Sequence, residues 1–185
     1  MQITGGFLKG RKLYSPPKDL NLIRPLRTRI RKALFDMLGQ DLSNSKVLDL
    51  FAGTGALGIE ALSRGAIFAV FVDNSPVSIS LIKKNLGKFD LLNKAKVFKL
   101  NLPKGLKILL KSFQNFFDLV FITPPYEKGL ALKTFQNLSK DLLQENATII
   151  VEERTGIELP EKMGNFEVIK KRSYGETTLH IYKVS

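Results

Sequence analysis

A glycine-rich turn between an apolar run and an amphipathic segment constrains the fold of this chain more than any other feature. The apolar run covers residues 47–51, and three glycines follow it in the spacing G-x-G-x-x-G, namely Gly53, Gly55 and Gly58. Glycine lets the backbone turn sharply, approach a ligand closely and pack a new helix against its strand. A second apolar run, residues 68–72, ends in Asp73, where a carboxylate can accept hydrogen bonds from ribose hydroxyls. The pattern predicts a strand, turn, helix and strand that bind a nucleoside cofactor.

The periodicity of apolar residues predicts the other elements. We expect helices over residues 28–42, 75–86, 102–113 and 128–143, strands over 95–100, 117–122 and 147–151, and a closing hairpin of strands 166–171 and 177–183. Ser75 is expected to cap the second of these helices, with Pro76 in its first turn. Five strands that alternate with helices predict an α/β fold with a doubly wound, mostly parallel sheet. The hairpin adds antiparallel pairing near one edge and makes the sheet seven-stranded.

Ligands of such sheets bind beyond the carboxyl ends of the parallel strands. Asp49, Asp73, Asn101 and the segment 123–126 all lie at these ends of the expected strands. We therefore expect them to converge on one crevice.

The charge of the chain predicts a polyanionic partner. The formal net charge is +12, and residues 1–34 carry nine Lys or Arg against the single acid Asp19. We expect a small basic N-terminal extension, residues 1–42, that consists of a hairpin or extended arm and a helix and belongs to the same domain as residues 43–185. Nucleic acid is the first candidate partner, and a solvated basic surface is the alternative.

Several classes of protein are excluded or disfavoured by what the sequence lacks. Cysteine is absent, which excludes disulfides, thiolate metal sites, iron–sulfur clusters and a cysteine nucleophile. The single histidine, His180, lies in an alternating run and is expected to be structural, and we expect no metal. No apolar run approaches the roughly 20 residues that cross a bilayer, and residues 1–6 do not look like a secretory signal. We therefore expect a cytoplasmic protein without a membrane partner.

A second motif, Thr123-Pro124-Pro125-Tyr126, follows the expected buried strand 117–122. Two prolines fix two φ angles and remove two N–H donors, so that the loop becomes a rigid set of carbonyl acceptors. Tyr126 adds a flat face on which a base can stack, a contact worth roughly 1–3 kcal/mol. The alternative interpretation is a rigid loop with an exposed tyrosine.

Together, residues 49–55 and 123–126 resemble the S-adenosylmethionine-dependent methyltransferases of exocyclic and side-chain amide nitrogens, which have the Rossmann-like class I methyltransferase fold. More narrowly, nearly the whole chain resembles the RsmD family of bacterial 16S ribosomal RNA guanine-N2 methyltransferases. The further stretches that carry this resemblance are residues 3–6, 9–13, 24–25, 29–35, 58–66 and 174–177.

The resemblance implies in-line transfer of the methyl group of S-adenosylmethionine to the amino nitrogen of a guanine that is turned out of its stack. The implied cofactor-binding residues are Asp49, Phe51, Gly53, Gly55, Asp73, Asn74 and Asn101, with Asp49 on the ammonium group, Asp73 on the ribose and Asn101 on the adenine. The implied catalytic residues are Thr123, Pro124, Pro125 and Tyr126. The partner is ribosomal RNA or a small-subunit assembly particle, and we expect the protein to be a monomer.

The basic extension is expected to bind RNA phosphates, and its affinity should therefore fall steeply with salt. The helix periodicity places the basic side chains around residues 27–32 towards solvent. The expected RNA-binding residues are Lys9, Arg11, Lys12, Arg24, Arg27, Arg29 and Arg31.

Two residues depart from the family pattern. Asn101 stands where the family usually has Asp, and its amide oxygen can still accept a hydrogen bond. Thr123 stands where the family has Asp or Asn. An exocyclic amine is a weak nucleophile and needs two hydrogen-bond acceptors, which here are the Pro124 carbonyl and the side chain at position 123. A threonine hydroxyl accepts more weakly than a carboxylate does.

Several alternatives therefore stay open. A DNA adenine-N6 or other amine methyltransferase shares both motifs, although it usually carries a further domain or recognition segment. A nicotinamide dehydrogenase accounts for the glycines and Asp73 but leaves the Pro-Pro-Tyr loop unexplained. A non-catalytic RNA-binding ribosome-assembly factor accounts for the charge and for Thr123.

Overall fold

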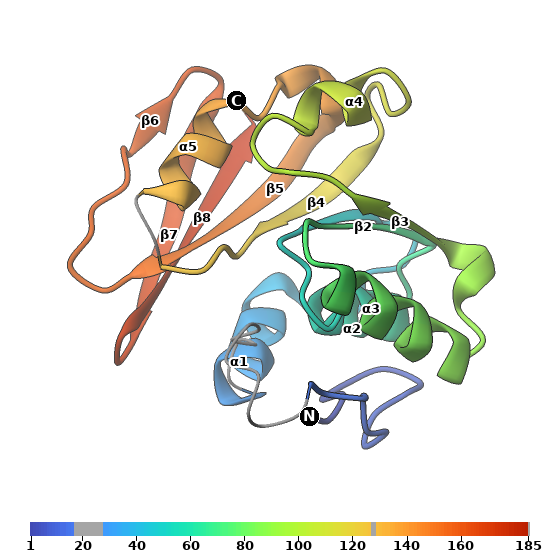
Figure 1. The fold of residues 1–185 in the computed structure, drawn as a ribbon. Helices are drawn as coiled ribbons and strands as arrows, with labels where there is room; N and C mark the ends of the chain where they lie inside the picture. The colour runs from blue at the N-terminus through green and yellow to red at the C-terminus, as the bar shows by residue number, and fades with distance from the viewer. Residues whose placement is uncertain (17–27, 127–128, 185) are drawn as a thin grey trace. The chain divides into compact units, whose positions relative to one another are not determined.

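The computed structural model describes residues 1–16, 28–126 and 129–184, and Figure 1 shows the course of the chain. The chain forms two compact units, Met1–Lys99 and Leu100–Ser185. The described residues contain eight strands, three in the first unit and five in the second, where seven were expected. The strand that the sequence did not predict is the two-residue β6 (Lys162–Met163), which is too short to leave a pattern.

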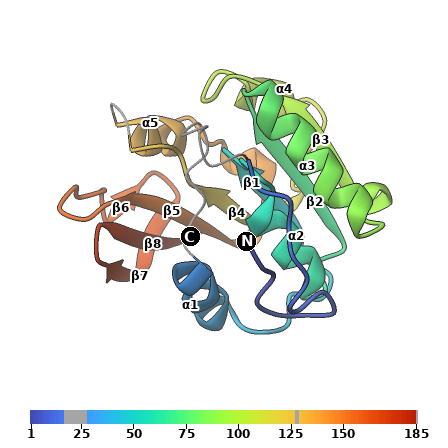
Figure 2. The ribbon, with the colours of Figure 1, turned by 60° about the horizontal axis from the view of Figure 1, so that its bottom comes forward.

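The first unit is built on three parallel strands in the order β3-β2-β1, namely β1 (Lys46–Leu50), β2 (Phe68–Asp73) and β3 (Ala95–Lys99). Helix α2 (Ala56–Ser63) packs against β1 and β2, and α3 (Pro76–Lys88) packs along β3 (Figure 2). The middle residues of β2 are fully buried, as the near-continuous apolar run of a parallel strand requires. This arrangement confirms the predicted strand, turn, helix and strand.

Two basic segments precede β1. Residues 1–16 fold back on themselves as a hairpin-like arm, in which the Ile3 N–H donates to the Arg11 carbonyl at 2.9 Å and the Gly10 N–H donates to the Ile3 carbonyl at 2.9 Å. Helix α1 (Thr28–Leu38) ends four residues earlier than expected, where Gly39 adopts a φ of +101°. The hairpin or arm expected over residues 1–25 is thus present as far as residue 16, and the remainder lies outside the described residues.

The second unit has the strand order β4-β5-β8-β7-β6. Strand β4 (Phe117–Ile122) lies parallel to β5 (Leu143–Arg154), and β8 (Thr177–Val184) lies antiparallel to β5. Strand β7 (Phe166–Tyr174) pairs antiparallel with β8 and completes the predicted hairpin. The antiparallel pairing expected at one edge is confirmed.

Two helices of this unit are shorter than expected. In the segment 102–113 the α-helical part is α4 (Leu106–Leu110), and among the described residues of the segment 128–143 the α-helical part is α5 (Leu130–Gln136). After α5 the Ser139 hydroxyl oxygen accepts the Asp141 N–H at 3.2 Å and starts a 3-10 turn, η2 (Lys140–Leu142), which leads directly into β5. Such local side-chain bonds compete with a continuing helix, so helical spacing alone overestimated its length.

Among the residues described, no helix is both long and apolar enough to span a lipid bilayer.

Candidate functional site

The loop after β1 is a backbone turn that few residue types can form. Phe51, Gly53 and Gly55 have φ values of +61°, +56° and +78°, in the left-handed region that favours glycine. A phenylalanine in this region is uncommon and marks a backbone that its surroundings hold in place. The Ala52 N–H donates to the Val72 carbonyl at 3.0 Å and ties the loop to β2.

The third glycine of the motif allows close packing between helix and strand. A Cβ atom at Gly58 would lie 2.3 Å from the ring of Phe71 in β2, a distance that no real contact reaches. Helix α2 can therefore approach β2 only because position 58 lacks a side chain. This confirms the packing role that the sequence predicted for the glycine.

Asp49 is a buried carboxyl group beside this loop. It is 1% exposed, and its Oδ2 accepts the Gly58 N–H at 3.0 Å, while its Oδ1 has no hydrogen-bond partner among the described residues. Burial raises the pKa of Asp49 to about 7, against the opposing effect of the Gly58 hydrogen bond, and the charge of Asp73 raises it further. A buried acceptor with an open lone pair suits a cationic or N–H group of a ligand.

Asp73 joins the loop to the start of α3. Its Oδ2 accepts the Gly53 N–H at 2.9 Å, and its Oδ1 accepts the Ser75 N–H at 2.9 Å. Each carboxylate oxygen retains a lone pair that can accept a ribose hydroxyl. Ser75 in turn caps α3 by accepting the Ser78 N–H at 3.4 Å, as predicted. The sequence indicated the ligand role of Asp73 but not that the same carboxylate fixes the glycine loop.

The expected cofactor residues fall in both units. The first unit contains those at the ends of β1 and β2, namely Asp49, Phe51, Gly53, Gly55, Asp73 and Asn74. Asn101 is exposed and belongs to the second unit. The hydrogen bond expected from Asn101 to an adenine, and the convergence of both motifs on one crevice, stay predictions.

The Pro-Pro loop follows β4 in the second unit. Thr123 is half-buried, Pro124 is buried and Pro125 is exposed. The Tyr126 hydroxyl is anchored at two points, because it donates to Glu152 Oε1 at 2.6 Å and lies 2.5 Å from Thr177 Oγ1.

These anchors fix the tyrosine that the sequence singled out. Glu152 lies near the end of β5, and Thr177 begins β8. The guanidinium carbon of Arg154 lies 5.8 Å from the centre of the Tyr126 ring. Sequence reasoning missed these neighbours, although Glu152 follows an expected strand and Thr177 lies in a stretch that carries the family resemblance.

The structure divides the expected RNA-binding residues into three groups. Lys9, Arg11, Lys12 and Arg29 are exposed. Arg24 and Arg27 lie outside the described residues. Arg31 contradicts the prediction, because its side chain is 0% exposed and its Nε donates to Glu60 Oε2 at 2.9 Å.

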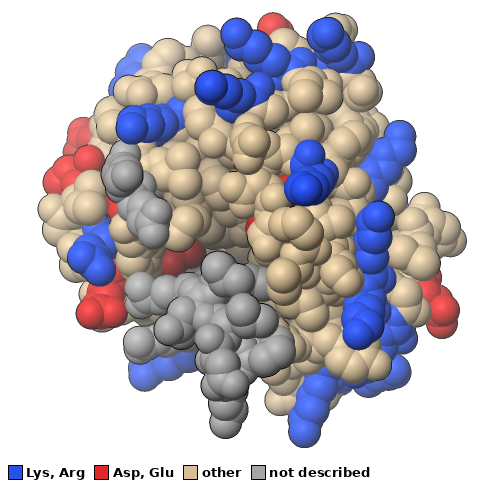
Figure 3. Space-filling model, viewed as in Figure 1, with Lys and Arg blue, Asp and Glu red and all other residues tan. Residues whose placement is uncertain are grey.

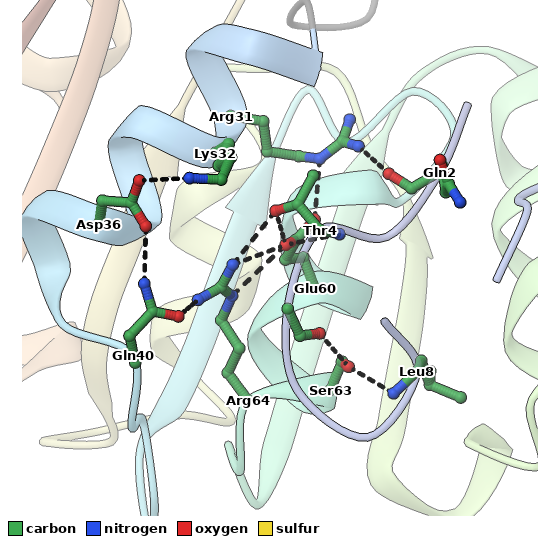
Figure 4. A network of polar contacts seen from close by, with 11 residues as sticks. Gln2, Thr4, Leu8, Arg31, Lys32, Asp36, Gln40, Glu60, Ser63 and Arg64 are labelled. Carbon is green, nitrogen blue, oxygen red and sulfur yellow. Dashed lines mark hydrogen bonds and ion pairs between the residues drawn. The ribbon is translucent and has the colours of Figure 1, made fainter. Parts of the chain in front are cut away.

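Figure 4 shows that Glu60 of α2 is the centre of a buried polar network. Its Oε1 accepts the Thr4 N–H at 3.0 Å and an Arg64 N–H at 3.0 Å. Arg31 contacts the other oxygen and also donates to the Gln2 carbonyl. Burial lowers the pKa of Arg31, and Glu60 opposes this shift. Arg31 therefore fastens α1 and the arm to α2 instead of facing solvent.

His180 lies in β8 and is buried, consistent with the strand position predicted for it. Burial, together with the charge of Lys171, lowers its pKa, so it is neutral at pH 7. Within residues 1–16, 28–126 and 129–184, no group of three or more His, Asp or Glu side chains is arranged to hold a metal ion.

Comparison with known proteins defines the family. Residues 1–183 match the model of the family described as Conserved hypothetical protein 95. The Ribosomal RNA small subunit methyltransferase D of Buchnera aphidicola from Acyrthosiphon pisum is 33% identical over 183 residues, which cover 97% of this chain and 91% of the relative. The protein of that name from Escherichia coli K12 is 32% identical over 185 residues, 99% of this chain and 89% of the relative. The chain belongs to the RsmD family.

Solved structures agree with this assignment. A hypothetical protein of Thermus thermophilus, TTHA0928, is 29% identical to this RsmD-family chain, with a TM-score of 0.77 and 98% of each chain covered. An RNA methyltransferase from Salinibacter ruber, solved in complex with S-adenosyl-L-homocysteine, has a TM-score of 0.65 at 13% identity, over 87% of this chain and 94% of the other. That second likeness concerns the fold alone. The expected α/β fold of the class I methyltransferase type is confirmed, with eight strands instead of seven.

Proposed function

We propose that this protein transfers the methyl group of S-adenosylmethionine to the exocyclic N2 amine of a guanine in small-subunit ribosomal RNA. The observation that carries the proposal is membership in the RsmD family over residues 1–183, with relatives named for methylation of small-subunit ribosomal RNA. The buried geometry beside the glycine loop supports it independently.

The residues of the first unit fit this cofactor. The unpartnered Oδ1 of Asp49 would accept a hydrogen bond from the ammonium group of the cofactor, and Asp73 would accept hydrogen bonds from the ribose hydroxyls of the cofactor. Gly53 and Gly55, which adopt positive φ values, have no side chains and so leave the backbone bare where the methionine part would pass. When bound, the cofactor supplies a methyl group on a positively charged sulfur. Asp49 must be ionised to pair with the ammonium, so its raised pKa makes binding depend on pH near neutrality.

The residues of the second unit would bind the target base. The Thr123 hydroxyl and the Pro124 carbonyl would accept the two N–H bonds of the amine and orient its lone pair. Tyr126 would stack on the base, held by Glu152 and Thr177 through its hydroxyl. Catalysis would then be mainly positioning. The nitrogen–methyl bond would form as the sulfur–methyl bond breaks, with S-adenosylhomocysteine as the leaving group and one proton of the amine released to solvent.

Labelled methyl transfer to small-subunit particles tests the proposal, and mass mapping of the RNA identifies the modified base. We expect the wild-type protein to label a guanine at N2 and the Thr123→Asp variant to remain active. If both proteins transfer no methyl group, the proposal is wrong. If the wild type is inactive and Thr123→Asp is active, Thr123 marks a lost activity, and a ribosome-assembly factor becomes the better interpretation.

The monomeric state and the cytoplasmic location are also part of the proposal. Light scattering at micromolar concentration and fractionation of cells that express the protein would test them. A stable dimer or a membrane-bound pool would contradict them.

A further inference from the structure

The N-terminal arm is fastened along one side of α3, although the two segments lie about 70 residues apart in sequence. The Asn85 side chain accepts the Tyr14 N–H at 2.7 Å and donates to the Tyr14 carbonyl at 3.1 Å. One helical turn further, Lys88 Nζ donates to the Lys12 carbonyl at 2.7 Å. The arm and the carboxyl-terminal half of α3 therefore present their side chains on one continuous surface, which we call the arm–α3 surface.

This surface is strongly basic. Residues 1–16 and α3 contain Lys or Arg at six positions and no Asp or Glu. All six side chains are exposed, namely Lys9, Arg11, Lys12, Lys83, Lys84 and Lys88. Figure 3 shows Lys and Arg side chains gathered at the lower right, over α3 and the arm, with acidic side chains at the right-hand edge of this region. Cations without interspersed carboxylates repel one another, and a polyanion relieves this repulsion.

Aromatic rings hold several of these cations in place. The half-exposed ring of Tyr14 has its centre 4.4 Å from Lys88 Nζ and 5.8 Å from Lys84 Nζ. The guanidinium carbon of Arg11 lies 5.5 Å from the centre of the Phe89 ring. Cation–π contacts of this kind restrict long side chains before a ligand arrives, so less conformational entropy is lost on binding.

We propose that the arm–α3 surface binds the phosphodiester backbone of the RNA substrate, with Lys84 and Lys88 of α3 as contacts beside those of the arm. The identity of the RNA rests on the proposed function, whereas the charge and geometry of the surface do not. Helix α3 begins three residues after Asp73, and Lys88 lies twelve residues further along the helix, or about 18 Å at 1.5 Å per residue. The surface therefore holds RNA that flanks the target and not the base that is methylated.

The test is the salt dependence of binding to a transcript of small-subunit ribosomal RNA. Each phosphate contact contributes about 0.7–0.9 to the slope of log K against log salt concentration. We expect Lys84→Ala/Lys88→Ala to reduce the magnitude of this slope by about 1.5. The matched control is Lys107→Ala/Lys111→Ala, which removes the same charge from exposed positions in and directly after α4. An equal reduction in the control, or none in the α3 variant, would overturn the proposal.

A second variant separates binding from structural damage. Lys83→Ala/Lys84→Ala leaves the Lys88 hydrogen bond to the arm in place and removes one of the two proposed α3 contacts, so we expect it to reduce the slope by about 0.7–0.9 with an unchanged melting temperature. If the salt-dependence slope falls only in variants whose melting temperature is also lower, the lysines do not contact phosphate directly.

Methyl transfer by the same variants distinguishes this inference from the proposed function. We expect Lys84→Ala/Lys88→Ala to raise KM for the RNA several-fold while kcat stays within about twofold. If the wild-type protein binds RNA with the expected slope but transfers no methyl group, the proposed function is refuted and the proposed RNA-binding role of the arm–α3 surface is not. An active wild type whose α3 variant binds with an unchanged slope would refute the surface alone.

Discussion

Replacement of Glu60 by glutamine tests whether the buried network holds the arm and α1 on α2. The change keeps the shape of the side chain but leaves Arg31 and Arg64 as two buried cations without their anion. Removal of one partner of a buried ion pair costs about 3–5 kcal/mol, because the remaining charge is uncompensated. A chain of this size loses about 2–4 °C of melting temperature per kcal/mol, so we expect Glu60→Gln to melt roughly 6–20 °C earlier than wild type.

The matched control is Lys32→Ala, which breaks the neighbouring Lys32–Asp36 pair on the outer face of α1. These two side chains are 63% and 41% exposed, and an exposed pair of this spacing contributes only about 0.3–0.5 kcal/mol. We expect a shift of about 2 °C or less. Differential scanning calorimetry on both variants gives the comparison directly.

Limited trypsin digestion adds a local measurement. Arg31 connects Glu60 to the Gln2 carbonyl, and Glu60 also accepts the Thr4 N–H, so removing the negative charge should loosen the arm and speed cleavage after Lys9, Arg11 and Lys12. If Glu60→Gln melts within 2 °C of Lys32→Ala and its arm is cleaved no faster than that of wild type, the network does not fasten the arm.

Four further predictions concern the glycine loop, the helix that follows it and the Pro-Pro loop. The pKa of Asp49 is raised to about 7, so binding of S-adenosylhomocysteine should tighten roughly tenfold from pH 6 to pH 8 as the carboxyl ionises, measured by calorimetry. The same raised pKa means that the folded protein loses stability as pH rises from about 4 to 7, and Asp49→Asn should therefore melt later than wild type at pH 8 but not at pH 4. Tyr126→Phe and Glu152→Gln should each lower kcat about three- to tenfold, because the hydroxyl anchor is lost or weakened. Gly58→Ala should lower the free energy of unfolding by about 1–3 kcal/mol, because the added methyl group meets Phe71.

Each of these has its own control. Gly87→Ala on α3 meets its nearest side-chain atom at 3.9 Å and should be neutral or stabilising, so equal losses at positions 58 and 87 would contradict the packing argument. Binding of S-adenosylhomocysteine that is independent of pH between 6 and 8 would contradict the role of Asp49. An unchanged kcat in Tyr126→Phe would show that the anchor does not position the base.

The parts of the fold that the sequence predicted well are those that depend on local rules. The turn at Gly53 and Gly55 needs positive φ angles, the Ser75 cap needs a short polar side chain, and the strand 117–122 has the bounds of β4. In each case the residue type is determined by the conformation of its own backbone or by neighbours a few positions away in the sequence. Such features can be recognised without knowledge of the tertiary structure.

The errors that concern side-chain partners arose where distant residues decide the outcome. Helical spacing alone placed Arg31 towards solvent, but Glu60, 29 residues later, provides a buried carboxylate that pairs with it. Likewise, the partners of Tyr126 come from β5 and β8, and no local pattern indicates that Glu152 and Thr177 meet its hydroxyl. A charge pattern can show that a segment is basic, but it cannot show which of its Lys and Arg side chains are buried in ion pairs with residues of the same chain.

The attachment of Tyr126 to β8 links the chemistry of one loop to the register of a hairpin. Thr177 pairs with Arg154 across β5 and β8, and Glu152 lies two residues before Arg154 on the same strand. A shift of β8 by one residue would turn the threonine to the opposite face of the strand and move its hydroxyl away from the Tyr126 hydroxyl. An insertion in the β7–β8 connection therefore preserves the orientation of Tyr126 only if it preserves the pairing of Thr177 with Arg154. The register of the hairpin and the position of the tyrosine ring depend on each other.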